Sequence, residues 1–214
     1  MKKALMVFAL VICALVWVLT GCGNGEKTQS SLSSAHPVSG GSEFKGKVLV
    51  VVPDRDYQDV EYDAVRTFLG RAGYEVVVAN STGGTSTGLS GRRVQADVKI
   101  GKADAADYRG IVLIGGPGAE AYADMPDLRG LVRHMARSDR VVSAICIAPV
   151  ILANAGVLEG RMATVWPDRA DRIAQRGARY VNEPVVVDGK IVTGDGPGSA
   201  EQFAQAVVKA LGGE

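Results

Sequence analysis

The sequence predicts an α/β protein whose sheet is doubly wound and mostly parallel, with helices on both faces. Two observations predict this class. Short apolar segments rich in β-branched residues alternate at least four times with segments of helical spacing, which is the order of a parallel sheet with crossover helices. The chain also holds 27 glycines among its 214 residues but few aromatic residues, which suits many tight turns between strands and helices.

The chain divides into three segments. Residues 1–21 have the basic start, the unbroken apolar run and the small residues of a bacterial secretory signal. Residues 22–45 are rich in Ser and Gly and poor in apolar side chains, so we expect a flexible tether. Residues 46–214 are long enough for one domain, which buries roughly 70% of its unfolded surface at this size.

The first part of the domain is predicted to alternate strand, helix and strand. Val48–Val52 is short and β-branched, as a fully buried parallel strand requires. A helix follows, with apolar residues at helical spacing: Val60, Ala64, Val65, Phe68, Leu69 and Ala72. Gly73 ends that helix. Tyr74–Ala79 is predicted to be the second strand, and Val94–Ile100 a small ribbon or an edge strand.

The middle of the domain is predicted to hold two more strand–helix units. Gly110–Ile114 reads as a buried strand closed by the glycine-rich turn 115–118, and Leu128–Met135 as the core of the next helix. Val141–Ile145 is the following strand. Pro149–Ala155 is the following helix, since proline fits the first helical turn.

The end of the domain is predicted to be a hairpin and a helix. Val185–Val187 and Lys190–Thr193 flank an Asp-Gly pair, which is a hairpin signal. Ser199 and Gln202 form the pattern of a capping box for a last helix, Ala200–Leu211. Because ligands of doubly wound sheets bind at the carboxyl ends of the strands, we expect functional residues there.

The segment Leu19-Thr20-Gly21-Cys22 predicts a lipid anchor. It resembles a lipobox, in which the thiol is acylated before the signal is cut. The apolar run before it is too short for a comfortable membrane span, although an uncleaved anchor helix with an incidental cysteine is the alternative. A diacylated thiol and an acylated amine give the chains that stable anchoring requires. Either way, the domain is expected in the cell envelope, facing the periplasm or the cell exterior.

The charge of the chain limits its expected partners, and the cysteine content limits its expected free thiols. The 24 basic and 23 acidic residues nearly cancel, and loss of Lys2 and Lys3 with the signal leaves a net charge of −1. That balance gives no electrostatic reason to expect nucleic acid or an acidic membrane surface as a partner. Cys13 lies in the signal and Cys22 is the lipid site, so Cys146 is the one free thiol expected in the mature chain.

Cys146 is the first candidate reactive residue. The preceding strand ends near Ile145 and Pro149 begins the next helix, so Cys146 falls on the turn between them. Ala144 and Ala148 are small, as a sharp nucleophile elbow requires, and a helix N-terminus favours a thiolate. A lone cysteine in an apolar segment is more often a small buried hydrophobe. The pattern leaves both interpretations open.

Glu61 is the second candidate. It precedes Ala64, Val65 and Phe68 by three, four and seven residues, so it shares the helix face that is directed toward the core. A carboxylate on that face is unusual without a partner. The alternative is an acid that stabilises the first helical turn through the helix dipole.

Nucleotide and metal sites are not supported by the remaining motifs. Gly116-x-Gly118-x-x-Ala121 imitates a dinucleotide fingerprint, but it follows a later strand and contains a proline that lacks an N–H group. The two histidines are His36, in the tether, and His134, which is expected on a solvated or core-edge helix position. Neither is placed to pair with a cysteine nucleophile or to complete a metal cluster.

Four segments together resemble the ThiJ/PfpI superfamily. They are Asp56–Glu61 (DYQDVE), Ile114–Gly118 (IGGPG), Ala144–Pro149 (AICIAP) and Val192–Gly198 (VTGDGPG). They occur in the family order and span nearly the whole domain. The resemblance implies a flavodoxin-like fold of the class I glutamine amidotransferase type.

The resemblance also implies a site and a partner. By it, Cys146 matches the elbow cysteine and Glu61 the acid hydrogen-bonded to that cysteine. The backbone N–H groups of Gly116 and Ile147 match the oxyanion site. The resemblance implies a homodimer and no metal or organic cofactor. Two departures from the family pattern matter. Ile147 stands where peptidase-type members have a histidine, and Trp166 stands where the superfamily's deglycase has one. Because the histidine of a catalytic triad is missing, proteolysis is disfavoured.

Three functions remain open on the sequence. The leading one is an enzyme of glyoxalase or deglycase type that uses Cys146 against small reactive carbonyls. The alternative is a non-catalytic redox or stress protein in which an oxidant converts Cys146 to sulfenic or sulfinic acid. A scaffold that has kept the fold and lost the chemistry is the third.

The anchor assignment predicts a clear labelling result. Wild-type protein should incorporate fatty acid and sediment with membranes, because the Cys22 thiol accepts the lipid. Cys22→Ala should do neither, whereas Cys146→Ala, which removes the other expected thiol, should behave as wild type. Metabolic labelling followed by fractionation measures both properties, and equal labelling of wild type and Cys22→Ala would refute the assignment.

Overall fold

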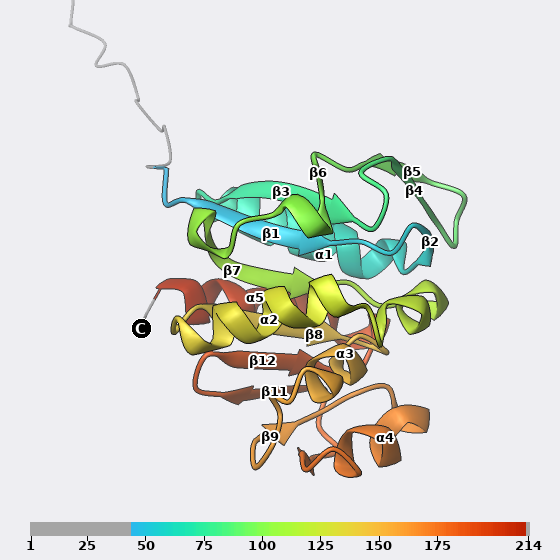
Figure 1. Ribbon diagram of the computed structural model, residues 1–214, viewed down its shortest axis with the longest axis vertical. Coiled ribbons are helices and arrows are strands. Elements are labelled where there is room, and N and C mark those ends of the chain that lie inside the picture. The colour runs from blue at the N-terminus through green and yellow to red at the C-terminus, as the bar shows by residue number, and fades with distance from the viewer. Residues whose placement is uncertain (1–43, 213–214) are drawn as a thin grey trace, which may run out of the picture. The chain divides into compact units, whose positions relative to one another are not determined.

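A seven-stranded sheet forms the centre of the computed structural model, which describes residues 44–212. Its strands are β1 (Lys47–Val51), β3 (Glu75–Asn80), β6 (Val98–Lys99), β7 (Tyr108–Leu113), β8 (Val141–Ile145), β11 (Val185–Asp188) and β12 (Ile191–Gly194). They lie in the order β11-β12-β8-β7-β1-β3-β6 (Figure 1). Every neighbouring pair is parallel except β11 with β12. The predicted mostly parallel sheet is confirmed.

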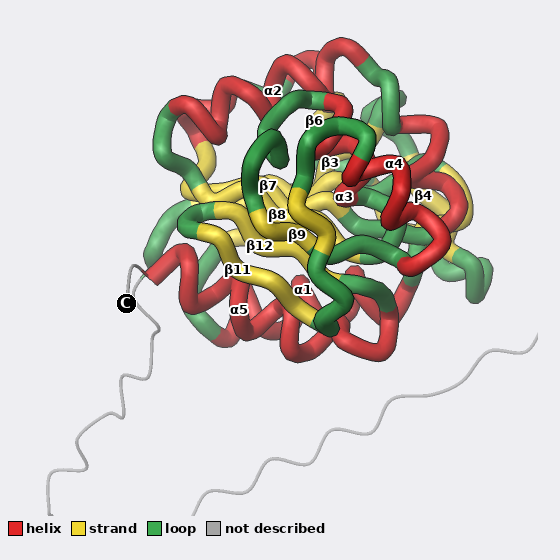
Figure 2. The backbone as a smooth tube through the Cα atoms, turned by 90° about the horizontal axis from the view of Figure 1, so that it is seen from below, coloured by secondary structure: helices red, strands yellow, loops and turns green. Residues whose placement is uncertain are grey.

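Helices cover both faces of this sheet. They are α1 (Asp59–Arg71), α2 (Pro126–Arg137), α3 (Pro149–Asn154), α4 (Ala170–Ala174) and α5 (Ala200–Gly212). Figure 2 shows α1 and α5 on one side of the sheet and α2 and α3 on the other. Short 3-10 turns occupy Ile100–Lys102, Ala105–Asp107, Pro117–Tyr122, Pro167–Arg169 and Pro197–Ser199. The doubly wound arrangement is therefore confirmed as well.

Alternation along the central strands builds two cores. In β1, Leu49 and Val51 point toward the helices α2 and α3, and Val48 and Val50 point toward α1 and α5. All four are buried. A strand that is covered on both faces needs apolar residues at every position, which explains why the sequence shows an unbroken apolar run there.

The order of the strands places the topological switch point between β1 and β7. The chain runs from β1 outward to β3 and β6, and then returns to β7, β8 and β12 on the other side of β1. The crossover direction therefore reverses between β1 and β7. In open α/β sheets the ligand site lies at this switch point, beyond the carboxyl ends of the strands.

Two small sheets flank the centre and were only partly foreseen. The first contains β2 (Arg55–Tyr57), β4 (Thr85–Gly88) and β5 (Arg93–Gln95), and the second contains β9 (Met162–Ala163) and β10 (Arg179–Tyr180). The segment Val94–Ile100 contributes both to the ribbon, through β5, and to the edge of the main sheet, through β6. Strand β2 was missed because it has only three residues and no apolar alternation.

Two local expectations are wrong. Val60 is 55% exposed, because the buried face of α1 is centred on Glu61, Val65 and Leu69 and Val60 lies at its margin. The Ser199 hydroxyl does not cap α5 in the predicted way, since it donates to the Gly196 carbonyl at 2.9 Å. The 3-10 turn that precedes α5 brings that carbonyl within reach.

The predicted signal and Cys22 lie outside the described residues, as does the tether apart from its last two residues. Among residues 44–212, no helix is both long enough and apolar enough to cross a membrane.

Two glycines should respond oppositely to alanine. A Cβ at Gly118 would lie 1.7 Å from the Arg55 carbonyl oxygen and 3.0 Å from the Pro53 ring, whereas a Cβ at Gly130 in α2 meets nothing within 4 Å. Gly118→Ala should lower the free energy of unfolding by about 2 kcal/mol or more through this overlap. Gly130→Ala should raise it by up to about 1 kcal/mol. Urea denaturation measures both, and equal effects would contradict the close approach at Gly118.

Candidate active site

Cys146 occupies a strained turn between β8 and α3. Its φ is +62°, a left-handed conformation that costs a non-glycine residue about 1–3 kcal/mol. Two backbone hydrogen bonds hold it there. The Cys146 N–H donates to the Gly194 carbonyl at 3.0 Å, and the Trp166 N–H donates to the Cys146 carbonyl at 2.8 Å. The predicted sharp elbow is confirmed.

Two backbone N–H groups converge on the Cys146 sulfur. They belong to Gly116, after β7, and to Ile147, the next residue on the elbow, and both favour the ionised form of the thiol. Gly116 has a φ of +96°, and a Cβ there would lie 2.3 Å from the Asp56 carbonyl oxygen. Only glycine permits this close approach of the loop that precedes α1. The two N–H groups that the resemblance implies therefore both act on the Cys146 thiol.

Glu61 lies in the first turn of α1 and is fully buried. Its Oε2 accepts a hydrogen bond from the Gly115 N–H at 2.9 Å. A Cβ at Gly115 would lie 2.5 Å from the Cys146 Cβ and 2.9 Å from the Glu61 Oε2. The thiol side chain and the carboxyl group therefore lie against the same glycine. The structure brings together the two residues that the sequence singled out by independent patterns.

Burial keeps Glu61 protonated. Desolvation raises the pKa of its carboxyl group from 4.5 to about 8, although the hydrogen bond from the Gly115 N–H and the nearby Cys146 side chain favour the charged form. The other oxygen, Oε1, is buried and has no hydrogen-bond partner within residues 44–212. A neutral carboxyl group at pH 7 thus has one oxygen engaged by the backbone and one left for the thiol or a ligand.

Burial also keeps the Cys146 thiol neutral, contrary to the expected thiolate. Desolvation raises the pKa of the thiol to about 12, the charge of an ionised Glu61 adds to this, and the N–H groups of Gly116 and Ile147 only partly oppose it. The side chain is 6% exposed. The six-residue helix α3 begins three residues beyond Cys146, and its dipole does not outweigh the desolvation.

Histidine is absent from this constellation. His134 lies on the exposed face of α2, as predicted, and His36 lies outside the described residues. Trp166 is 39% exposed, and its ring lies against Gly196, where a Cβ would come within 2.9 Å of the ring. Neither Ile147 nor Trp166 can exchange a proton at neutral pH. Within the described residues, no three His, Cys, Asp or Glu side chains group as a metal site.

Three backbone groups of this site were missed by the sequence reasoning. The Gly115 N–H holds Glu61, and the Gly194 carbonyl and the Trp166 N–H hold the elbow. Backbone groups are present at every residue, so composition and spacing give no signal for them. The double glycine after β7 was the one feature that pointed to such a close approach.

Comparisons with known proteins identify the family. The sequence profile of the DJ-1/PfpI family matches residues 46–210. A protein named a deglycase in Pyrococcus horikoshii is 32% identical, and the match covers 77% of this chain and 99% of that protein. A protein named a glutathione-independent glyoxalase in Caenorhabditis elegans is 27% identical, with 77% of this chain and 88% of that protein covered.

A solved structure shows the same fold. The ThiJ/PfpI domain protein of Brachyspira murdochii superposes with a TM-score of 0.77 and 30% sequence identity. The match covers 80% of this chain and 98% of that one.

The raised pKa of Glu61 predicts a dependence of stability on pH. Between pH 4.5 and about 8 the folded protein holds a proton at Glu61 that the unfolded chain releases. The stability that this proton contributes is therefore lost as the pH rises through that window. Glu61→Gln removes the titration, so wild type should lose stability relative to Glu61→Gln between these pH values.

Urea unfolding of both proteins across a pH series measures this difference. Glu183→Gln removes an exposed carboxyl group and controls for the lost charge. A stability difference between wild type and Glu61→Gln that stays constant from pH 4.5 to 8 would show that Glu61 is not held protonated.

Proposed function

The chain belongs to the DJ-1/PfpI family, and we propose that it uses Cys146 against small reactive carbonyl compounds, as a glyoxalase or deglycase does. Relatives with these names support the general type of activity. The observation that carries the proposal is the convergence on one sulfur of two backbone N–H groups and a buried carboxyl group. Fold alone would not select this chemistry.

The first step is addition of the thiol to an aldehyde. The Cys146 sulfur forms a bond with the carbonyl carbon, and the π electrons of the carbonyl move to its oxygen. The thiol proton ends on that oxygen, so the product is a neutral hemithioacetal and no oxidant or reductant is consumed. The N–H groups of Gly116 and Ile147, which favour negative charge on the sulfur, would stabilise the neighbouring oxygen as charge develops there.

Glu61 is suited to move that proton. A neutral carboxyl group can donate a proton from one oxygen while its other oxygen accepts one, so it can relay the thiol proton without a net change of charge. Its pKa of about 8 keeps it protonated at neutral pH, and its Oε1 is free of other partners within the described residues. This relay replaces the histidine that Ile147 and Trp166 do not supply.

Oxidation of Cys146 is a second candidate function, and the unpaired Glu61 Oε1 favours it. If a peroxide oxidises the thiol, the new sulfur-bound oxygen can accept a hydrogen bond from a protonated carboxyl group. The same N–H groups of Gly116 and Ile147 would stabilise negative charge on that oxygen. Both candidates use the same three contacts and differ in whether the substrate is a carbonyl compound or an oxidant.

The cell envelope is the proposed location. The support is the lipobox-like segment that ends at Cys22, which would anchor the domain by lipid and hold it outside the cytoplasm. Small electrophiles that reach the envelope would then be the substrates available to Cys146.

Turnover of methylglyoxal tests the proposal. The purified protein should convert it, Cys146→Ser should lower the rate by about a hundredfold or more because the nucleophile is lost, and Glu61→Gln should lower it by about a hundredfold because the relay is lost. Cys146-dependent cleavage of casein should be absent, since no histidine serves as a base. The rate of methylglyoxal loss and the product are measured by nuclear magnetic resonance.

Two results would separate the candidates. Equal turnover by wild type and Cys146→Ser would overturn the carbonyl proposal. Absent turnover together with peroxide oxidation of Cys146 that changes in Glu61→Leu would favour the redox function, because both depend on contact between the two side chains.

A further inference from the structure

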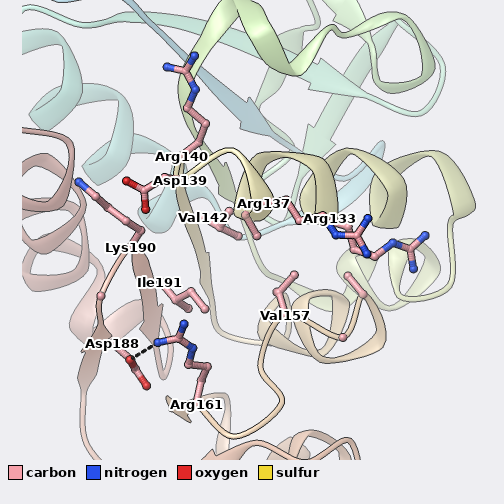
Figure 3. A pocket seen from close by; sticks show the side chains of 14 residues that line it. Arg133, Arg137, Asp139, Arg140, Val142, Val157, Arg161, Asp188, Lys190 and Ile191 are labelled. Carbon is pink, nitrogen blue, oxygen red and sulfur yellow. Dashed lines mark hydrogen bonds and ion pairs between the residues drawn. The ribbon is translucent and has the colours of Figure 1, made fainter.

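A hollow of about 610 Å³, whose lining is drawn in Figure 3, lies at the amino ends of the central strands. It is bounded by the end of α2, the beginning of β8, the turn between β11 and β12, and the segment that follows α3. Val142 lines it at the start of β8, whereas Cys146 follows the other end of that strand. The length of the strand separates the hollow from the reactive thiol.

Positive charge is concentrated around this hollow. Its lining includes five basic residues: Arg133, Arg137, Arg140, Arg161 and Lys190. Two acidic residues, Asp139 and Asp188, face them. The whole chain has 24 basic and 23 acidic residues, so this excess is local. The expectation that charge gives no reason for nucleic acid or an acidic membrane surface as a partner rested on the total charge and not on its distribution.

The acidic residues neutralise only part of this positive charge. Asp188 pairs with Arg161 at 3.0 Å and also accepts the Met162 N–H at 2.9 Å, so both of its oxygens are engaged. For Arg133, Arg137, Arg140 and Lys190, no carboxylate lies within 4.0 Å among residues 44–212. Elsewhere surface arginines do find partners, as Arg92 does with Asp63.

The floor of the hollow is apolar. Val142, Val157 and Ile191 lie between α2, which bears Arg133 and Arg137, and the Arg161–Asp188 pair on the other side (Figure 3). A ligand that fills the space would therefore place carbon against the floor and anionic oxygens toward the rim. The volume suits a small organic molecule rather than an inorganic ion alone.

We propose that this hollow binds a phosphate ester. Four of its five cations are arginines, whose planar guanidinium groups match the oxygens of a phosphate by paired hydrogen bonds. The ester carbon would contact the apolar floor. The site is separate from Cys146 and does not depend on the reaction proposed for it.

Two sources share this chemistry: a soluble phosphate ester and the headgroup of an anionic phospholipid. Strand β1 begins at Lys47, at the same end of the sheet as the starts of β8 and β12, because these strands are parallel (Figure 1). The described chain therefore begins at the end of the sheet that holds the hollow. This placement makes a lipid headgroup a source that the experiment has to include.

Calorimetry of the full-length chain in a neutral detergent tests the site. The ligands are glycerophosphate, dihexanoylphosphatidylglycerol and dihexanoylphosphatidylcholine, with glycerol as the uncharged reference. The variant pair Arg133→Gln with Arg137→Gln removes two charges at the hollow. The matched control, Arg66→Gln with Arg93→Gln, removes two exposed charges on α1 and β5, away from the hollow.

The phosphate-ester site predicts binding that weakens about tenfold or more in the Arg133 and Arg137 variant and stays unchanged in the control. Binding of glycerophosphate would identify a soluble ester as sufficient. Binding of phosphatidylglycerol alone would identify the lipid headgroup. The proposal is overturned if no ligand binds, if both lipids bind equally, or if the two double variants lose affinity alike. Unfolding curves of both variants show whether each is folded.

Discussion

The left-handed turn at Cys146 is the constraint on which the site depends. A non-glycine residue keeps a φ of +62° only if its surroundings hold it, and here the holding groups come from β12, through Gly194, and from the loop that contains Trp166. The turn directs the sulfur toward β7, where the Gly116 N–H reaches it. Each of these strands is central and buried, so the strain at one residue is balanced by the rigidity of the whole sheet.

Burial then decides which groups of the site are protonated. The same lack of water that raises the pKa of Glu61 to about 8 raises that of Cys146 to about 12. Both groups are therefore neutral at rest, and the fold avoids the cost of a buried charge. Reactivity has to come from proton transfer during bond formation rather than from a standing thiolate. An acid that can both give and accept a proton is the partner that such a thiol needs.

Much of this could be predicted from the sequence, and the failures have physical reasons. Buried strands show as apolar runs. Glu61 stood out because a carboxylate lies on the core face of its helix, and Cys146 because it falls on a turn between small residues. The Gly115 N–H could not be found, since backbone donors leave no mark in composition. Val60 was misplaced because helical spacing does not say where the covering layer ends. The basic hollow was hidden because a net charge averages over the whole surface.

The fold itself explains how the two proposed sites can coexist. In a parallel sheet the carboxyl ends of the strands gather the helix starts and loops that build a reactive centre. The amino ends of the strands gather the ends of the helices. There the last turns of α2 bring arginines beside the start of β8. Cations at a helix C-terminus are favoured by its dipole, so Arg137 is stabilised without a carboxylate partner. The carboxyl ends of the strands thus hold neutral, buried groups suited to a carbonyl compound, and the amino ends hold exposed charge suited to an anion.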